Sequence, residues 1–284
     1  MLYFSSPAKI NRMLRVIRRE ENGYHYLQTV FQFTDLFDEI GFEVRQDNEI
    51  HFNYDHTDFS LEEDLIYRAI IALKDYTHTD KGVTVDLIKK LPMGAGIGGG
   101  SSNAATTLVA LNALWELNLH ETELINLGQK LGADVPIFIY GKSAWAEGIG
   151  EKLTEIEIPE EEFTLINPDI HISTKRIFES PELPRNSPLF KNKVFDQSRA
   201  INDCLPAIYH HYPVMRLIMH ALDNINVNPY ITGTGSCIFV PKMTSEQSLF
   251  LTTLAEENDW ELRPFKSMNQ SLLYQNSPIH LNTH

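Results

Sequence analysis

A glycine-rich segment in the first half of the chain constrains the fold more than any other part of the sequence. Residues 91–103 read L-P-M-G-A-G-I-G-G-G-S-S-N, with five glycines and two serines. The stretch 83–88 before it is typical of a strand, and the stretch 104–117 after it is typical of a helix. A glycine-rich turn that opens a helix exposes unpaired backbone N–H groups at the positive end of the helix dipole. The segment therefore predicts a site for a nucleotide or another phosphorylated ligand.

Several known loops could account for these glycines. Gly94, Gly96 and Gly99 satisfy the G-x-G-x-x-G of dinucleotide-binding folds. That fold also needs an acidic residue at the end of the next strand, and Glu116 lies in a helical pattern instead. A P-loop requires a lysine directly after its last glycine, and none follows here. A proline-led P-x-x-x-G-x-G-x-G-S-S loop fits without adjustment. A plain tight turn is disfavoured, because so many glycines cost chain entropy.

Length and composition indicate a globular protein of one large domain or two ordinary ones. The chain has 284 residues, of which 43% are apolar and 22% charged. No apolar run approaches the length of a membrane span, and the first residues do not resemble a signal peptide, so we expect a cytoplasmic location. Cys204 and Cys237 lie far apart and form neither a disulfide framework nor a metal motif.

The charge balance limits the partners that this chain can bind. A formal net charge of −14 argues against general affinity for nucleic acid or for anionic membranes. Anion binding must therefore be local, through backbone amides and a few positioned cations. The glycine-rich segment supplies the amides.

Strand and helix patterns are mixed along the chain. Strands are expected at 2–15 with a break at Pro7, and at 27–44, 83–88, 163–167, 230–232 and 238–240, with a hairpin over 143–158. Helices are expected after a capping box at 60–63, and at 104–117, 121–131 with Gly132 as its cap, 174–179 and 245–258, with broken helices over 195–222. Because βαβ units do not alternate regularly, the pattern favours an α+β fold. The acidic run 159–162 marks the expected domain boundary.

Three separated motifs together resemble those of the GHMP small-molecule kinases. They are S-P-A-K-I-N at 6–11, the segment 92–103, and T-G-T-G-S at 232–236. The resemblance implies a two-domain architecture, with an N-terminal ATP-binding domain over 1–158 and a C-terminal, ferredoxin-like substrate domain over 159–284. It also implies an ATP-dependent phosphotransferase with ATP as co-substrate and Mg²⁺.

Further motifs narrow the resemblance to one branch of that family. N-G-Y-H at 22–25, G-A-D-V-P at 132–136 and P-E-L-P-R-N at 181–186 are similar to a branch that phosphorylates the 2-hydroxyl of a cytidine diphosphate-linked methylerythritol. That reaction belongs to the non-mevalonate route to isoprenoid precursors. Two departures from the pattern are Ala95, where glycine is usual, and the stretch 13–15, which is usually more apolar.

Two charged residues are the candidates for catalysis. Asp134 lies just beyond a helix end and before an apolar run, where a carboxylate could face a cleft as a general base. By its local sequence alone, it would rather be a turn or helix-capping aspartate. Lys9 lies in an apolar strand, where an unpaired ammonium group is costly to bury. We expect it to pair with Asp134 beside the acceptor hydroxyl, and the alternative is an edge-strand lysine with its head in solvent.

The resemblance also implies the residues that contact ligands. The predicted phosphate loop consists of Pro92, Met93, Gly94, Ala95, Gly96, Ile97, Gly98, Gly99, Gly100, Ser101 and Ser102. The two serines are expected at the start of the following helix, as caps and as hydroxyl donors to phosphate. The turn 233–236 is expected to pack against the active site.

For the acceptor substrate, the resemblance implies that Tyr24 and Phe178 stack on the cytosine and that His25 hydrogen-bonds it. Phe178 is otherwise an ordinary core aromatic residue. Asn11 and Thr174 would contact the methylerythritol diphosphate.

No metal-ligating side chain is predicted. Glu147 is a conceivable ligand, but an exposed strand glutamate is the favoured interpretation. The eleven histidines form no H-x-x-H pattern, so a zinc site is not expected. Expected partners are small molecules only, without nucleic acid or membrane, in a monomer or weak homodimer. Two alternatives stay open: a related kinase acting on homoserine, mevalonate or a sugar, and a nucleotide-binding protein without catalysis.

Overall fold

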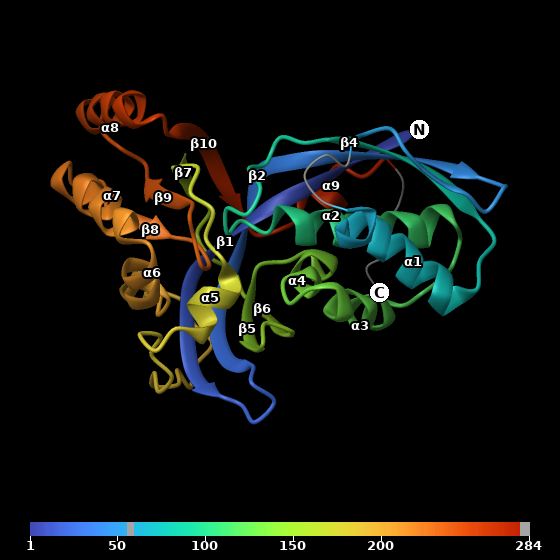
Figure 1. Cartoon of the computed structure of the whole chain (residues 1–284), viewed down its shortest axis with the longest axis horizontal. Helices are drawn as coiled ribbons and strands as arrows, with labels where there is room; N and C mark the ends of the chain where they lie inside the picture. The colour runs from blue at the N-terminus through green and yellow to red at the C-terminus, as the bar shows by residue number, and fades with distance from the viewer. Residues whose placement is uncertain (56–59, 279–284) are drawn as a thin grey trace.

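The computed structural model describes residues 1–55 and 60–278 and has two lobes that share long strands (Figure 1). Hydrogen bonds join the strands in the order β3-β4-β2-β10-β7-β9-β8, and β1 and the β5–β6 hairpin attach to β2. Their bounds are β1 Leu2–Arg19, β2 His25–Arg45, β3 Ile50–Phe52, β4 Gly82–Ile88, β5 Ala144–Gly148, β6 Lys152–Glu155, β7 Glu162–Asn167, β8 Tyr230–Ile231, β9 Ile238–Pro241 and β10 Glu261–Met268. The mixture of strands and helices without regular alternation confirms the α+β class.

The first two strands are the axis of the molecule. β1 and β2 pair antiparallel from Leu2 opposite Phe42 to Arg19 opposite His25, and in Figure 1 they run through both lobes. The predicted break at Pro7 is wrong, because β1 is continuous. The proline, which has no N–H to donate, is accommodated by a register shift directly after it.

The first lobe covers one face of this sheet with helices. These are α1 Leu65–Thr77, α2 Gly99–Leu114, α3 Glu121–Leu131 and α4 Val135–Tyr140. Helix α2 is buried along most of its length, because strands lie on one side of it and α1, α3 and α4 on the others. Phe33 of β2 and Phe138 of α4 meet edge to face at 5.8 Å within this core.

The second lobe has the strand order β10-β7-β9-β8, with helices between β7 and β8 and between β9 and β10. This is a βαββαβ unit with its first strand between the third and the fourth, which confirms the ferredoxin-like prediction. Its helices are α5 Thr174–Glu179, α6 Leu205–His211, α7 Pro213–Asn224 and α8 Ser245–Asn258. Helices α6 and α7 both have a proline in their first turn, Pro206 and Pro213, which fits there because the N–H groups of that turn have no intrahelical partner.

The predicted domain boundary at 158/159 stays a prediction, and packing crosses it twice. Leu14 of β1 lies in the apolar core of the second lobe. In the other direction, the end of β10 pairs with β2, and α9 (Leu272–Gln275) follows. Leu273 lies in the core of the first lobe, and the Tyr274 hydroxyl donates to the carbonyl oxygen of Ile139 in α4.

Most expected elements lie within a few residues of their expected bounds, and α3, α5 and α8 match them residue for residue. The starts of three helical regions differ. Helix α2 begins at Gly99 instead of Ala104, because the glycine-rich segment itself forms the first turn. The capping box at Ser60 closes only a 3₁₀ helix, Leu61–Glu63, and Asp64 caps α1 through the Ile66 N–H at 2.7 Å. The region 195–222 begins with a 3₁₀ helix, Gln197–Arg199.

Within residues 1–55 and 60–278, no helix has both the length and the apolar character that crossing a membrane requires.

Candidate active site

A cleft of about 1300 Å³ is lined by residues from both lobes. Its wall includes β1, the glycine-rich segment, the start of α4, helix α5 and the turn 233–235. These are the segments that carry the sequence motifs, so the fold gathers motifs that are far apart in the chain.

The glycine-rich segment presents backbone donors to the cleft. The cap of α2 is Gly98, in the left-handed conformation with φ of 77°. The first intrahelical bond runs from the Ser102 N–H to the Gly98 carbonyl oxygen at 2.8 Å. The N–H groups of Gly99, Gly100 and Ser101 therefore precede the hydrogen-bonded part of the helix, and all three residues line the cleft. This is the geometry that binds phosphate oxygens.

Two of the glycines are required by close approach. A Cβ atom on Gly96 would lie 2.6 Å from the Thr232 carbonyl oxygen and 2.8 Å from that of Gly235. A Cβ atom on Gly98 would lie 2.8 Å from the Phe138 ring and 3.1 Å from Cε of Lys9. The turn of the third motif thus packs directly on the phosphate loop, as expected from the sequence.

Not every predicted loop residue faces the cleft. Pro92, Met93, Gly94 and the remaining glycines line it, as does Ala95. Ala95 and Ile97 belong to an apolar cluster and are 4% and 1% exposed, and Ile97 does not line the cleft. Ser102 is fully buried and accepts a hydrogen bond from the Ser6 hydroxyl at 2.9 Å. The prediction that the serines cap the helix is wrong, because the helix begins two residues before Ser101.

Lys9 lies in β1 with its ammonium group inside the cleft wall. Its Nζ is 3.2 Å from Oδ2 of Asp134, and its side chain is 3% exposed. The same group donates to Oδ1 of Asn11 at 2.7 Å and to the carbonyl oxygen of Gly96 at 3.1 Å. The predicted ion pair is therefore present, and it lies against the phosphate loop.

Asp134 occupies the cap position of α4 but makes no capping hydrogen bond with its side chain. Its side chain is 37% exposed and lines the cleft. Asp134 thus has the turn and cap position that its local sequence indicates, but its side chain does not act as the cap. The Asp134 carboxylate therefore faces the cleft, where it can contact a ligand, and the Lys9 ammonium group lies beside it.

Asn11 and Thr174 both line the cleft and connect its walls. Besides accepting from Lys9, the Asn11 amide donates to the Thr29 hydroxyl at 2.8 Å, and its backbone N–H donates to the Thr232 hydroxyl at 3.0 Å. The hydroxyls of Thr174 and Thr234 are 2.9 Å apart. The third motif is therefore tied to β1 on one side and to α5 on the other.

The three residues expected at the base lie at one end of the cleft. Tyr24 is 60% exposed, whereas His25 is buried, and its ring centroid is 5.4 Å from that of Phe178. Phe178 also packs against the core of the second lobe, as an ordinary core aromatic residue would, and its stacking on a base stays a prediction. Burial lowers the pKa of His25, and the neighbouring guanidinium groups of Arg185 and Arg19 lower it further.

The sequence interpretation missed two cations. Lys89 lines the cleft, with Nζ 2.7 Å from the buried carboxylate of Asp38 and 3.0 Å from the carbonyl oxygen of Leu91. Its position shortly before the phosphate loop was the feature of the sequence that could have indicated a role in the cleft. Arg185 donates to Nε2 of His25 at 3.1 Å. It belongs to the P-E-L-P-R-N motif, which the sequence singled out without assigning it a task.

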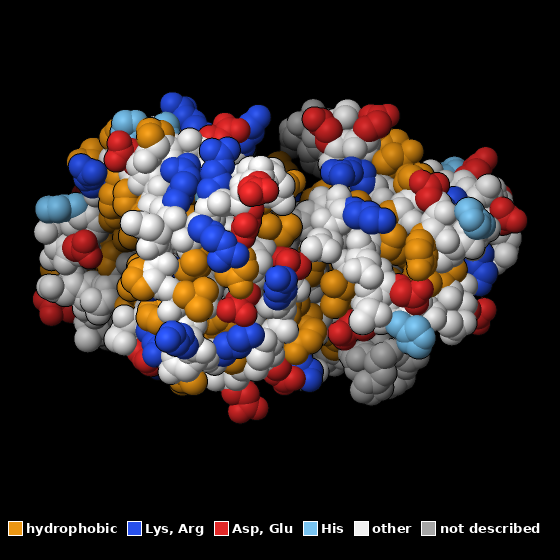
Figure 2. All heavy atoms as spheres, turned by 90° about the horizontal axis from the view of Figure 1, so that it is seen from below, with side chains coloured by type: hydrophobic (Ala, Val, Ile, Leu, Met, Phe, Trp, Pro, Cys, Tyr) orange, Lys and Arg blue, Asp and Glu red, His pale blue; other side chains and the backbone are white. Residues whose placement is uncertain are grey.

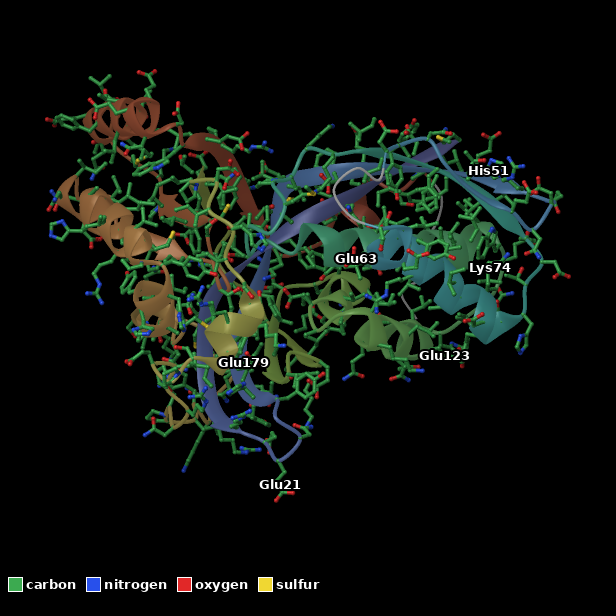
Figure 3. All side chains as sticks on the ribbon, in the orientation of Figure 1. Glu21, His51, Glu63, Lys74, Glu123 and Glu179 are labelled. Carbon is green, nitrogen blue, oxygen red and sulfur yellow. The ribbon has the colours of Figure 1, made fainter. Side chains whose placement is uncertain are left out.

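Carboxylates enter the cleft from both lobes. Figure 3 labels Glu63 before α1 and Glu179 on α5, and both line the cleft. Glu147 does not line it; the carboxylate accepts from Gln28 and pairs with Lys193 at 3.0 Å. Among the described residues, no three His, Cys, Asp or Glu side chains gather in a way that could hold a metal ion.

The face of the molecule seen from below (Figure 2) is not uniformly acidic despite the net charge of −14. Figure 2 shows Lys and Arg side chains interspersed with acidic and apolar ones over the face seen from below. Attraction of an anionic ligand therefore depends on the local donors and cations already described.

Comparison with known proteins agrees with the motifs. Residues 64–142 match the model of the GHMP kinases N terminal domain. A 4-diphosphocytidyl-2-C-methyl-D-erythritol kinase of Pseudomonas aeruginosa strain LESB58 is 44% identical over 238 residues, which cover 84% of this chain and 84% of that protein. A protein of the same name from Nitrosococcus oceani is 42% identical over 96% of this chain and 97% of its own length.

Solved structures agree as well. A crystal structure of 4-(cytidine 5'-diphospho)-2C-methyl-D-erythritol kinase superposes with a TM-score of 0.78 at 27% identity, over 93% of this chain and 98% of that chain. The mevalonate kinase of Methanococcus jannaschii has a TM-score of 0.65 at 17% identity, over 94% of this chain and 98% of its own, which is a likeness of fold alone. The family resemblance predicted from the three motifs is thereby confirmed.

Proposed function

The chain belongs to the family of 4-diphosphocytidyl-2-C-methyl-D-erythritol kinases, a branch of the GHMP kinases, and from this premise we propose how its cleft performs that reaction. The γ-phosphoryl group of ATP is transferred to the 2-hydroxyl of 4-diphosphocytidyl-2-C-methyl-D-erythritol. The products are the 2-phosphate and ADP. The observation that carries the proposal is the Lys9–Asp134 pair at 3.2 Å, directly beside the start of α2.

The phosphate loop holds the triphosphate. Phosphoryl transfer needs positioning and neutralisation of charge more than covalent chemistry. The free N–H groups at the start of α2 donate to phosphate oxygens, and the Ser101 hydroxyl adds a donor. These donors are fixed by the packing of the third motif on Gly96, so they do not reorganise when charge moves during transfer.

Asp134 and Lys9 act on the acceptor hydroxyl. The hydroxyl oxygen forms a bond to the γ-phosphorus while the bond from that phosphorus to the β–γ bridging oxygen breaks. Asp134 accepts the hydroxyl proton. The Lys9 ammonium group stabilises the negative charge that develops on the attacking oxygen, and Asn11 holds the ammonium group in place through the 2.7 Å hydrogen bond.

Mg²⁺ is expected to arrive bound to ATP, where it neutralises phosphate charge. Oxygen donors suit this ion, and the Ser101 hydroxyl and the Asp134 carboxylate are oxygen donors that line the cleft. We propose that phosphate and water oxygens supply most of its ligands.

The base of the acceptor binds at the Tyr24–His25–Phe178 end of the cleft. Tyr24 and Phe178 provide stacking surfaces, and His25 provides a hydrogen bond to the base edge. Thr174 lines the cleft with its hydroxyl 2.9 Å from that of Thr234 in the third motif, and it would contact the substrate diphosphate. A cytoplasmic location and a monomeric or weakly dimeric state remain parts of the proposal.

One assay separates this function from its rivals. ADP release is measured with the cytidylyl substrate, mevalonate, homoserine and galactose for the wild type, Asp134→Asn and the control Asp223→Asn on α7, which lies outside the cleft. We expect turnover with the cytidylyl substrate alone, lost by about 100-fold or more in Asp134→Asn and kept in the control. Turnover of another acceptor would select a related kinase, and ATP binding without transfer would select a binding protein.

A further inference from the structure

Arg185 is a cation that the reaction described above does not use. It follows α5 in the loop 180–187, and its guanidinium group donates hydrogen bonds to four acceptors. Its Nε donates to Nε2 of His25 at 3.1 Å, and Nη1 donates to the carbonyl oxygen of Leu183 at 3.1 Å. Its Nη2 donates to the carbonyl oxygens of Phe178 at 3.1 Å and Ser180 at 2.8 Å. One side chain therefore contacts two of the three residues proposed for the cytosine end of the cleft, His25 and Phe178.

The contact with His25 determines where the imidazole proton lies. A guanidinium group has donors and no acceptor. Nε2 of His25 must therefore accept, which requires a neutral ring with its proton on Nδ1. Within the described residues, no protein group has a hydrogen bond to Nδ1, and this atom is not among the buried polar atoms without a partner. Because His25 lines the cleft, its Nδ1–H is left for a ligand.

We propose that Arg185 is a positioning residue that sets the preference of this cleft for cytosine over uracil. It holds His25 in the tautomer that presents an N–H donor, and it holds the end of α5, which carries Phe178. Cytosine has an unprotonated N3 that accepts from such a donor, whereas N3 of uracil carries a hydrogen and would face it donor to donor. The inference rests on the proposed function, because it assumes that the acceptor carries a base.

The electrostatic surroundings of His25 support a neutral ring. Burial and the guanidinium groups of Arg185 and Arg19 lower the pKa of His25, so protonation is disfavoured near neutral pH. Arg19 reaches the ring from β1 and Arg185 reaches it from the loop after α5. A protonated ring would also lose the hydrogen bond from Arg185, because Nε2 would no longer accept.

A spectroscopic test in the ligand-free protein does not depend on turnover. The full chain is labelled with ¹⁵N-histidine, and the His25 signals are identified by their loss in His25→Phe. We expect the wild type to have a protonated Nδ1 and an unprotonated Nε2, and we expect Arg185→Met to show a mixture of both tautomers. A wild type with the proton on Nε2 would overturn the proposal.

A kinetic test measures the selectivity itself. The ratio of kcat/KM for the cytidylyl substrate to that for its uridylyl counterpart is compared between the wild type and Arg185→Met. We expect the ratio to fall about tenfold, the loss of one good hydrogen bond, with KM for ATP unchanged. Arg185→Lys, which also only donates, should restore most of the ratio.

The matched control is Arg199→Met. Arg199 also holds loop carbonyl oxygens, those of Asn192 and Val194, but neither of these residues lines the cleft, whereas His25 and Phe178, which Arg185 contacts, both do. An equal fall of the ratio in this control, or an unchanged ratio in folded Arg185→Met, would refute the assignment. If Arg185→Met does not fold, Arg185→Lys and the tautomer of the wild type decide. Failure of the proposed function would appear separately, as a wild type that turns over neither substrate while the tautomer is as stated.

Discussion

Replacing Lys9 by methionine should remove catalysis without unfolding the protein. The ammonium group is 3% exposed and lies 3.2 Å from the Asp134 carboxylate. At that distance and an effective dielectric constant of about 20, the attraction is about 5 kcal/mol. Solvent weakens it, because the Asp134 side chain is 37% exposed. Taking the ammonium group out of water opposes the remainder by several kcal/mol.

The Coulomb attraction and the cost of taking the Lys9 ammonium group out of water nearly cancel in the free energy of folding. The methionine side chain fills similar space, and the Thr232 hydroxyl lies 3.4 Å from both the Asn11 amide oxygen and the Gly96 carbonyl oxygen that lose their donor. We therefore expect the free energy of unfolding to change by less than about 2 kcal/mol. The reaction has no such compensation, because only Lys9 carries positive charge next to Asp134, among the ion pairs of the described residues. We expect kcat to fall by about 100- to 1000-fold.

The assay is coupled ADP release with the cytidylyl substrate, combined with urea unfolding of the same preparations. The control is Lys74→Met, which removes a lysine of α1 that donates to the Lys81 carbonyl oxygen at 2.8 Å, away from the cleft (Figure 3). Its kcat should equal that of the wild type. A folded Lys9→Met protein with kcat within about threefold of the wild type would refute the reasoning.

Three further predictions concern the loop and the base end of the cleft. Gly96→Ala should lower the free energy of unfolding by about 2 kcal/mol or more, because φ is 77° and the added Cβ would meet two carbonyl oxygens of the third-motif turn. The measurement is urea unfolding. The control Gly100→Ala, whose Cβ would meet only a leucine methyl at 3.5 Å, should lower the free energy of unfolding far less. Phe178→Ala should raise KM for the cytidylyl substrate about tenfold and leave KM for ATP unchanged, as measured by steady-state kinetics, and an equal rise in both would contradict a stacking role. The pKa of His25 is lowered from 6.5, so this residue binds fewer protons in the folded protein than in the unfolded chain. The contribution of neutral His25 to stability and to cytidylyl binding is therefore complete above pH 6.5 and is lost as the pH falls below that value. A KM for the cytidylyl substrate that does not change on the acid side would contradict this.

The sequence predicts this site well where a motif imposes one backbone geometry. Gly96 and Gly98 have no alternative to glycine because carbonyl oxygens and a ring occupy the space of their Cβ atoms. The cost of burying an ammonium group alone predicts a partner for Lys9, and the motif resemblance indicated Asp134 as that partner. In each case a local pattern contains the physical reason for the contact.

Other features depend on contacts that local patterns do not contain. Ser102 turns away from the cleft because Ser6, 96 residues earlier, offers a buried hydrogen-bond partner. Pro7 leaves β1 unbroken because β2 tolerates a register shift there. Arg185 reaches His25 across 160 residues. Such contacts form only in the folded protein. The sequence could therefore indicate which residues are candidates for the site, but it could not indicate which distant residues they contact.

The return of the chain end to the first lobe has a consequence for synthesis. Helix α9 packs against β1, and its Tyr274 hydroxyl donates to α4, the helix that Asp134 directly precedes. On the ribosome, α4 therefore receives this contact only after residues 272–275 have left the exit tunnel. We expect a chain stopped before residue 268 to bind ATP more readily than it turns over. Full turnover by such a chain would show that the brace is dispensable.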